Sequence, residues 1–164
     1  MSAETSSPFY SVYLIDGVSG VELISYEYAR TQTIVDINAV SAMFNALEAF
    51  INNLAYCSQY ERVQEINFQG TRIVYEHYSI ANHSVLCVGI SNKQYLAPLE
   101  HFLLKEIVME FASCFRRQIV NFRGNVQPFR TFITRLAGFP FEELSTLIQS
   151  PLSGDITPIS PLAP

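Results

Sequence analysis

The chain has 164 residues, a length that suits one domain able to bury roughly 70% of its unfolded surface. Hydrophobic residues make up 49% of it and charged residues 15%, which excludes a disordered chain, because disordered chains bury too little apolar surface to offset the entropy lost on folding. A net charge of −5 argues against general binding of nucleic acid by the whole surface.

Positive charge is concentrated in one segment. Residues 116–140 hold five arginines and no carboxylate, and subtracting these five charges from the net charge of −5 leaves −10 on the rest of the chain. Such a segment can bind an anionic membrane or an acidic partner, or it can be an ordinary solvated helix face. The candidate binding residues are Arg116, Arg117, Arg123, Arg130 and Arg135.

The lack of a targeting signal in the sequence and the spacing of the cysteines indicate the compartment. No run approaches the ~18 uncharged apolar residues that a membrane-spanning helix needs, and residues 1–8 lack the basic start and apolar run of a secretory signal. Cys57, Cys87 and Cys114 are odd in number, widely spaced and set among apolar residues, so we expect buried free thiols in a reducing compartment. The expected location is cytoplasmic, and the arginine segment leaves peripheral membrane contact open.

The first predicted elements after the polar arm, residues 1–8, are two strands. Residues 9–16 are rich in aromatic and β-branched side chains, residues 17–20 contain two glycines, and residues 21–28 alternate imperfectly between apolar and polar. This pattern predicts a hairpin.

A long amphipathic helix is predicted next, over residues 37–55, with Asp36 as its N-cap. Its apolar residues recur at steps of three and four, which places them on one stripe of a helix. They are Ile37, Val40, Phe44, Leu47, Phe50, Ile51 and Leu54.

Three further strands are predicted at residues 63–68, 71–78 and 84–90, separated by turns at Gln69-Gly70 and Asn82-His83. The third run is continuously apolar, which is typical of a central strand covered on both faces. Helices must therefore lie on both sides of the sheet.

Helices are predicted for the rest of the folded part. Pro98 stands at the first position of a long helix that ends near residue 122, and Pro128 begins a shorter helix that ends near residue 136. One last small helix precedes a proline-rich tail, and we expect residues 138–164 to form a partly mobile extension. The predicted fold is α+β, with a five-stranded antiparallel sheet between helices in the order β-β-α-β-β-β-α-α.

No pattern of catalytic or ligand-binding residues is found in the sequence. Phosphate-binding and nucleophile-elbow glycine motifs are absent, and the histidines share no metal-ligand spacing with cysteines or carboxylates. We therefore expect no enzyme, no cofactor and no metal. The histidines, for which we expect structural or surface roles, are His77, His83 and His101.

The order of elements and four local patterns resemble the longin-like and roadblock group of domains, over residues 9–136. The patterns are the Asp16-Gly17 turn before Leu23-Ile-Ser-Tyr26, the helix 36–50 with Val40-Ser-Ala42 and Ala46, the strands with Ile66-Asn-Phe68, Gly70 and Ile73-Val-Tyr75, and the glycine-centred step over residues 122–129. The resemblance implies a longin-like domain over residues 9–137 with a five-stranded antiparallel sheet between helices. The C-terminal extension has no counterpart in the pattern.

Members of this group are non-catalytic modules of membrane-traffic machinery and scaffolds or regulators of small GTPases, commonly as homo- or heterodimers. The resemblance therefore implies a protein-interaction module whose partner is a small GTPase or another longin- or roadblock-type protein. Partner contacts are expected at an edge strand, at a helix face and at the arginine segment. The expected edge residues are Val63, Glu65 and Phe68.

The alternative function is a small-ligand sensor, in which a cleft between sheet and helix would be lined by Tyr75, His77 and Tyr78. An enzyme is the least favoured class, because no constellation of residues supports it.

Overall fold

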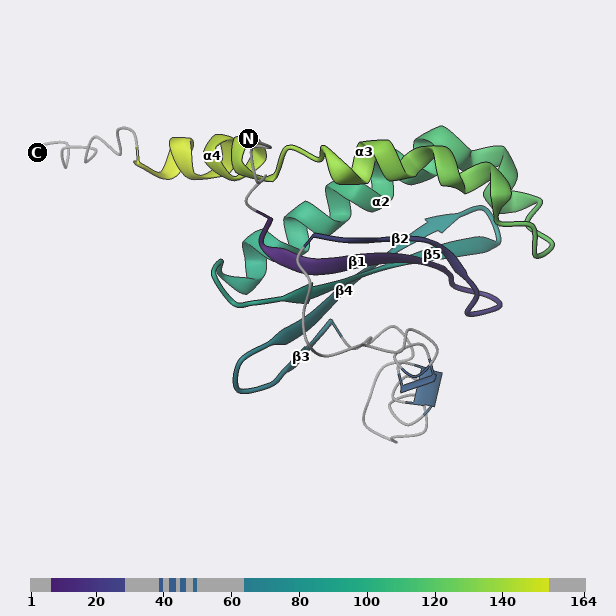
Figure 1. The fold of residues 1–164 in the computed structure, drawn as a ribbon, viewed down its shortest axis with the longest axis horizontal. Coiled ribbons are helices and arrows are strands. Elements are labelled where there is room, and N and C mark those ends of the chain that lie inside the picture. The colour runs from purple at the N-terminus through teal and green to yellow at the C-terminus, as the bar shows by residue number, and fades with distance from the viewer. Residues whose placement is uncertain are drawn as a thin grey trace, which may run out of the picture.

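The computed structural model describes residues 7–28 and 64–153, together with positions 39, 42, 43, 45, 46 and 49; for residues 149–153 it describes only the backbone. These residues form an α+β fold with an open antiparallel sheet and three α-helices (Figure 1). The fold class expected from the sequence is therefore confirmed.

The sheet has the order β2-β1-β5-β4-β3, with every neighbouring pair antiparallel. The strands are β1 (Phe9–Asp16), β2 (Glu22–Glu27), β3 (Glu65–Asn67), β4 (Arg72–Ile80) and β5 (His83–Ser91). β5 lies in the centre and is buried from Val85 to Ser91, as its uninterrupted apolar sequence predicts.

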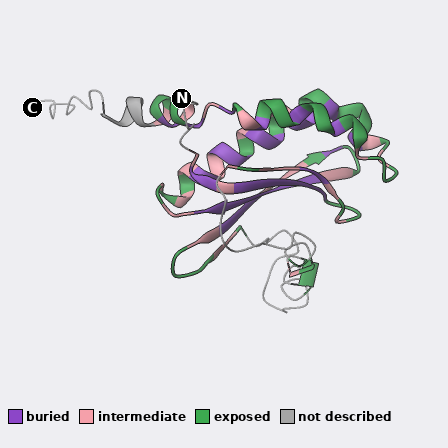
Figure 2. Ribbon diagram, in the orientation of Figure 1, coloured by how far each residue is buried: buried purple, intermediate pink, exposed green. Residues whose placement is uncertain are grey.

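One face of the sheet packs against α2 (Ala97–Val120), which lies across it in Figure 1. The buried positions of α2 recur at steps of three and four, from Leu103 to Ile119, and form the sheet-facing stripe that is purple in Figure 2. They pack against alternate residues of the strands, including Val12, Leu14 and Cys87. This cluster is the main core.

A second, smaller core lies on the other face of the sheet. Tyr13, Ile15, Leu86 and Val88 belong to it, and Met43 packs against it. Met43 and the other described positions between 39 and 49 are helical, in agreement with the predicted helix over 37–55, and the rest of that prediction, including the Asp36 cap, lies outside the described residues.

Asp16 lies at the β1–β2 turn, as the sequence predicts. Its Oδ2 accepts hydrogen bonds from the backbone N–H of Ser19, at 2.9 Å, and from the Ser19 hydroxyl, at 2.6 Å. Gly20 has a φ of +74°, which explains why glycine occupies this place. Asp16 therefore stabilises the turn, and only one of its carboxylate oxygens is used.

The C-terminal part contains the 3-10 helix η1 (Gln127–Phe132), α3 (Ile133–Ala137) and α4 (Phe141–Ser153). η1 and α3 together replace the single short helix predicted after Pro128. Phe139 and Phe141 lie in the main core, where the ring of Phe141 packs edge-to-face on Phe9 at 5.8 Å. The predicted extension thus begins inside the core, and α4 then extends past the end of the sheet (Figure 1). The tail after residue 153 lies outside the described residues.

Two local predictions are wrong. The turn predicted at Asn82-His83 lies at Ala81 and Asn82, where Ala81 has a φ of +51° and His83 already pairs with Ile80. Cys114, predicted to be buried, is exposed, because α2 presents Phe111 and Phe115 to the core and thereby turns Cys114 outward. The buried state of Cys87 is confirmed, and Cys57 lies outside the described residues.

Candidate functional site

The outer edge of β3 is a candidate site because β3 is the last strand of the sheet among the described residues. It pairs with β4 through the register Glu65↔Val74, Ile66↔Ile73 and Asn67↔Arg72. The Tyr75 N–H donates to the Gln64 carbonyl at 3.1 Å, so position 64 faces β4. Because backbone groups alternate in direction along a strand, the N–H and C=O of Glu65 and Asn67 point to the outer edge.

Arg72 fastens this edge to the body of the protein. Its Nε donates to Asn67 Oδ1 at 2.9 Å, and its Nη1 donates to Glu100 Oε2 at 3.0 Å. Glu100 is fully buried in the first turn of α2, where its other carboxylate oxygen accepts a hydrogen bond from the Ser91 hydroxyl. One buried carboxylate therefore connects β3, β4, β5 and α2 through two side chains.

His101 adds a second, more exposed link. Its Nδ1 lies 2.9 Å from Glu76 Oε1, and its Nε2 lies 3.9 Å from Glu65 Oε2. The ring thus lies between carboxylates of β3 and β4. This cluster was not predicted from the sequence, although period-two alternation places Arg72 and Glu76 on the face of β4 that α2 covers, beside Glu100 and His101.

Apolar side chains are exposed near the same edge. Phe68, directly after β3, has 48% of its surface exposed, and Leu96, directly before α2, has 80% exposed. The Lys93 ammonium group donates to the Phe68 carbonyl oxygen, which holds these two segments together. Of the predicted edge residues, Glu65 and Phe68 lie at this edge, and Val63 lies outside the described residues.

The opposite edge strand, β2, packs against helical segments. η1 and α3 both contact β2, and the Tyr28 hydroxyl just beyond it donates to the Leu136 carbonyl oxygen of α3 at 2.5 Å. Burial raises the pKa of the Tyr28 hydroxyl well above its ordinary value, with smaller contributions from Cys87 and Tyr26. Among the described residues, β2 therefore packs against helical segments, whereas β3 packs mainly against β4.

The arginine segment is a second candidate surface. All five arginines are exposed. Arg135 is already paired, with Nε at 2.5 Å and Nη2 at 3.1 Å from the two carboxylate oxygens of Glu110. Within the described part of the chain, no ion pair involves the other four, which are Arg116, Arg117, Arg123 and Arg130.

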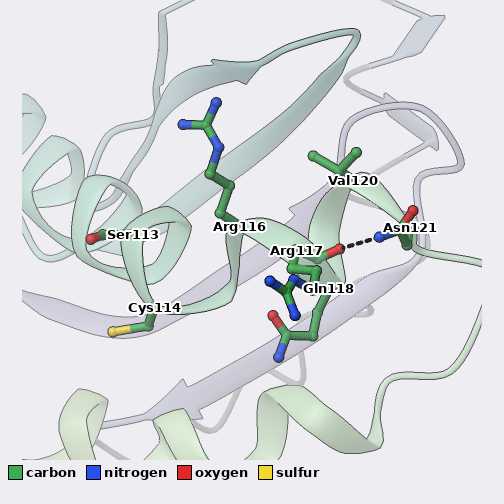
Figure 3. A pocket seen from close by; sticks show the side chains of 7 residues that line it. All are labelled: Ser113, Cys114, Arg116, Arg117, Gln118, Val120 and Asn121. Carbon is green, nitrogen blue, oxygen red and sulfur yellow. Dashed lines mark hydrogen bonds between the residues drawn. The ribbon is translucent and has the colours of Figure 1, made fainter.

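An open hollow of about 600 Å³ lies beside the first two arginines, where α2 departs from helical geometry at Phe115 (φ −121°, ψ 21°). Figure 3 shows the Arg116 side chain directed away from those of Arg117 and Gln118. The residues that line the hollow are Ser113, Cys114, Arg116, Arg117, Gln118, Val120 and Asn121.

The residues of the predicted ligand cleft do not share one face. Tyr75 is buried in the second core, whereas Tyr78 packs against the main core on the other side of the sheet. His77 lies beside Tyr75, with ring centroids 5.3 Å apart. Period-two alternation along β4 separates positions 75 and 78, so one cleft cannot be lined by all three.

Metal and membrane sites were also sought in the described residues. There, no three histidine, cysteine or carboxylate side chains are arranged so that they could hold a metal ion together. None of the helices in the same part of the chain is both long enough and apolar enough to cross a bilayer.

No family model matches this chain, and neither does any curated protein.

Proposed function

We propose that this chain is a non-catalytic protein-interaction module that acts in the cytoplasm as a scaffold or regulator of small GTPases or of membrane-traffic-type machinery. It works as a homo- or heterodimer, with a small GTPase or another longin- or roadblock-type protein as partner. The observation that carries the proposal is the outward edge of β3, flanked by exposed Phe68, in a sheet whose other edge strand, β2, packs against η1 and α3. The five-stranded antiparallel sheet is also the fold that the resemblance implies, which supports the proposal.

Strand addition supplies the mechanism. An incoming strand bonds to the outward N–H and C=O groups of Glu65 and Asn67, and main-chain hydrogen bonds provide affinity in this mode of recognition. Three residues form too short an edge to suffice alone, because a stable interface buries on the order of 1,200–2,000 Å² in total. Phe68 and Leu96 extend the contact with apolar surface.

Proline substitution tests this mechanism. Glu65→Pro removes one outward N–H and leaves the bonds between β3 and β4 in place, because position 65 does not donate toward β4. Glu65→Ala is the matched control, since it removes the same carboxylate but keeps the N–H. In size-exclusion chromatography with light scattering, we expect the wild type and Glu65→Ala to be dimers. We expect Glu65→Pro to be a monomer.

The GTPase partner is tested separately, by pull-down of small GTPases loaded with GDP or with a GTP analogue. Binding that depends on the nucleotide supports the proposal. A wild-type chain that stays monomeric at every concentration tested and retains no GTPase contradicts it.

A further inference from the structure

We propose that the hollow at the bend of α2 binds an extended, acidic peptide segment of a partner protein, through Arg116 and Arg117. This surface is independent of the β3 edge. β3 is fastened to the first turn of α2 at Glu100, and Arg116 lies 16 residues further along, which is about 24 Å of helix.

Unbalanced charge is the first argument. Arg116, Arg117 and Arg123 lie at the end of α2 and in the loop after it, and no carboxylate occurs between Glu110 and Glu142. Glu110 is the nearest acidic residue before the segment, and it is already paired with Arg135. The other arginines have no ion-pair partner in the described part of the chain. A negatively charged ligand supplies the counter-charge that this surface lacks.

The shape of the surface is the second argument. The Phe115 ring is buried among Phe111 and Phe129, at centroid distances of 5.0 and 5.4 Å, and the bend at this residue redirects the last turns of α2. The hollow is lined by residues from before and after this bend. Ser113, Gln118 and Asn121 line it with groups that hydrogen-bond to a peptide backbone, so it suits a chain rather than an ion alone.

The directions of the arginines distinguish between anionic ligands. Because Arg116 and Arg117 point to different sides (Figure 3), their guanidinium groups do not converge on one phosphate. A peptide with several carboxylates reaches both. A membrane fits less well, because the large apolar side chains that are exposed among the described residues include none between Met109 and Ile133, where a bilayer would need an apolar anchor.

A stabilising role for these arginines is the competing explanation. Arg117 lies in the last turn of α2, where a positive charge interacts favourably with the helix dipole. That role requires no ligand. A purely stabilising role predicts that loss of the charge lowers thermal stability and that the wild type does not bind the peptide.

The test is fluorescence anisotropy with a labelled peptide of about 12 alternating glutamate and serine residues, which spans ~40 Å when extended. We expect saturable binding at about 50 mM NaCl that weakens at least ~10-fold at about 500 mM NaCl, because salt screens exposed charges. The double substitution Arg116→Glu and Arg117→Glu should weaken binding at least ~10-fold.

A matched control separates the site from the overall charge. Lys105 is exposed on the same helix, outside the hollow, so Lys105→Glu introduces elsewhere the change of charge that Arg117→Glu makes in the hollow. Lys105→Glu should bind the peptide nearly as well as the wild type, and Arg117→Glu should bind it more weakly. Should the reversed arginines impair folding, as judged by circular dichroism, Arg116→Gln with Arg117→Gln replaces them with neutral groups of similar polarity.

Thiol labelling locates the bound peptide. Cys114 lines the hollow and is exposed, whereas Cys87 is fully buried, so in a Cys57→Ser background N-ethylmaleimide should modify Cys114 first. Saturating peptide should slow that modification. Absence of saturable binding, equal losses in the arginine and lysine variants, or binding to vesicles with about 30% phosphatidylserine but not to the peptide would each overturn the proposal.

Discussion

At Gly17 the backbone of the β1–β2 turn passes so close to Ser84 that no side chain fits. A Cβ atom at this position would lie 2.0 Å from the Ser84 hydroxyl oxygen and 2.9 Å from its carbonyl oxygen. The hydroxyl can rotate away, but the carbonyl cannot, because it accepts a hydrogen bond from the Gly17 N–H at 2.8 Å. The identity of one residue thus decides how β1 and β5 meet at this end of the sheet.

Gly17→Ala should destabilise the protein by about 1–3 kcal/mol, the usual effect of forcing extra atoms into a filled space. Gly70→Ala is the control, because a Cβ atom there meets nothing within 4 Å. It should change the free energy of unfolding by less than about 0.5 kcal/mol, as most surface substitutions do. Urea denaturation of both variants checks the pair, and equal effects would contradict the contact at Ser84.

At the scale of elements, the Glu100–Arg72 pair joins parts of the chain that no continuous stripe of apolar residues connects. β3 has three residues, of which only Ile66 packs into the second core, so much of its attachment is polar. The pair is partly shielded from water, because the Glu100 side chain is fully buried and that of Arg72 is 15% exposed. Such a pair is costly to break by removal of Glu100, since Arg72 then keeps as its charged partner only the more exposed Glu65, whose Oε2 lies 3.6 Å from Arg72 Nε.

Glu100→Ala should therefore cost about 3 kcal/mol, at the lower end of the range for buried pairs because Arg72 retains some contact with water. Arg72→Met in the same chain should recover part of that loss. A double-mutant cycle by chemical denaturation should show a coupling of more than about 1 kcal/mol. Purely additive effects would mean that the two side chains act independently.

At the scale of the whole molecule, the two candidate surfaces lie toward opposite ends of α2, and the main core lies between them. The β3 edge carries exposed apolar side chains beside the Glu100 network, and the bend of α2 carries arginines that have no ion-pair partner among the described residues. With both surfaces occupied as proposed, the protein would hold two partners at once without overlap, as a scaffold does.

Alkaline pH should destabilise the folded protein, because two acidic groups, the Cys87 thiol and the Tyr28 hydroxyl, stay protonated in the folded chain at a pH at which they ionise in the unfolded chain. Burial raises the pKa of the Cys87 thiol and of the Tyr28 hydroxyl above the ordinary values of 9.0 and 10.0. The unfolded chain releases these protons as the pH rises through those values, whereas the folded chain keeps them. The contribution of the two groups to the free energy of unfolding is therefore fully present below pH 9.0 and is lost as the pH rises further. Each group contributes a slope of about 1.4 kcal/mol per pH unit.

Cys87→Ala removes one of the two groups and should reduce the alkaline slope, although it also lowers stability at neutral pH because it leaves a small cavity. Cys114→Ala is the control, since that thiol is exposed in the folded protein. Free energies of unfolding measured by denaturant between pH 7 and pH 11 provide the comparison. Identical slopes for the wild type and Cys87→Ala would show that Cys87 ionises in the folded protein.

Much of the fold could be predicted from local patterns. The boundaries of β1 were predicted to the residue, β5 was predicted as a central strand from its uninterrupted apolar sequence, and Asp16 was predicted as a turn residue. The exposure of Cys114 was not predicted. Its neighbours in the sequence are apolar, but apolar neighbours alone do not show which face of the helix a residue occupies.

The amino-acid sequence alone determined which segments become strands and helices, because periodicity and turn residues act between close neighbours. Only the tertiary structure decided which edge strand packs against η1 and α3, and that Glu100, Arg72 and Ser91 meet. It also decided that Arg135 has an ion-pair partner within the described ranges, whereas Arg116 and Arg117 have none there. Each of these depends on contacts between residues far apart in the chain. The order β2-β1-β5-β4-β3 and the path of α2 set those contacts, and no local pattern encodes them.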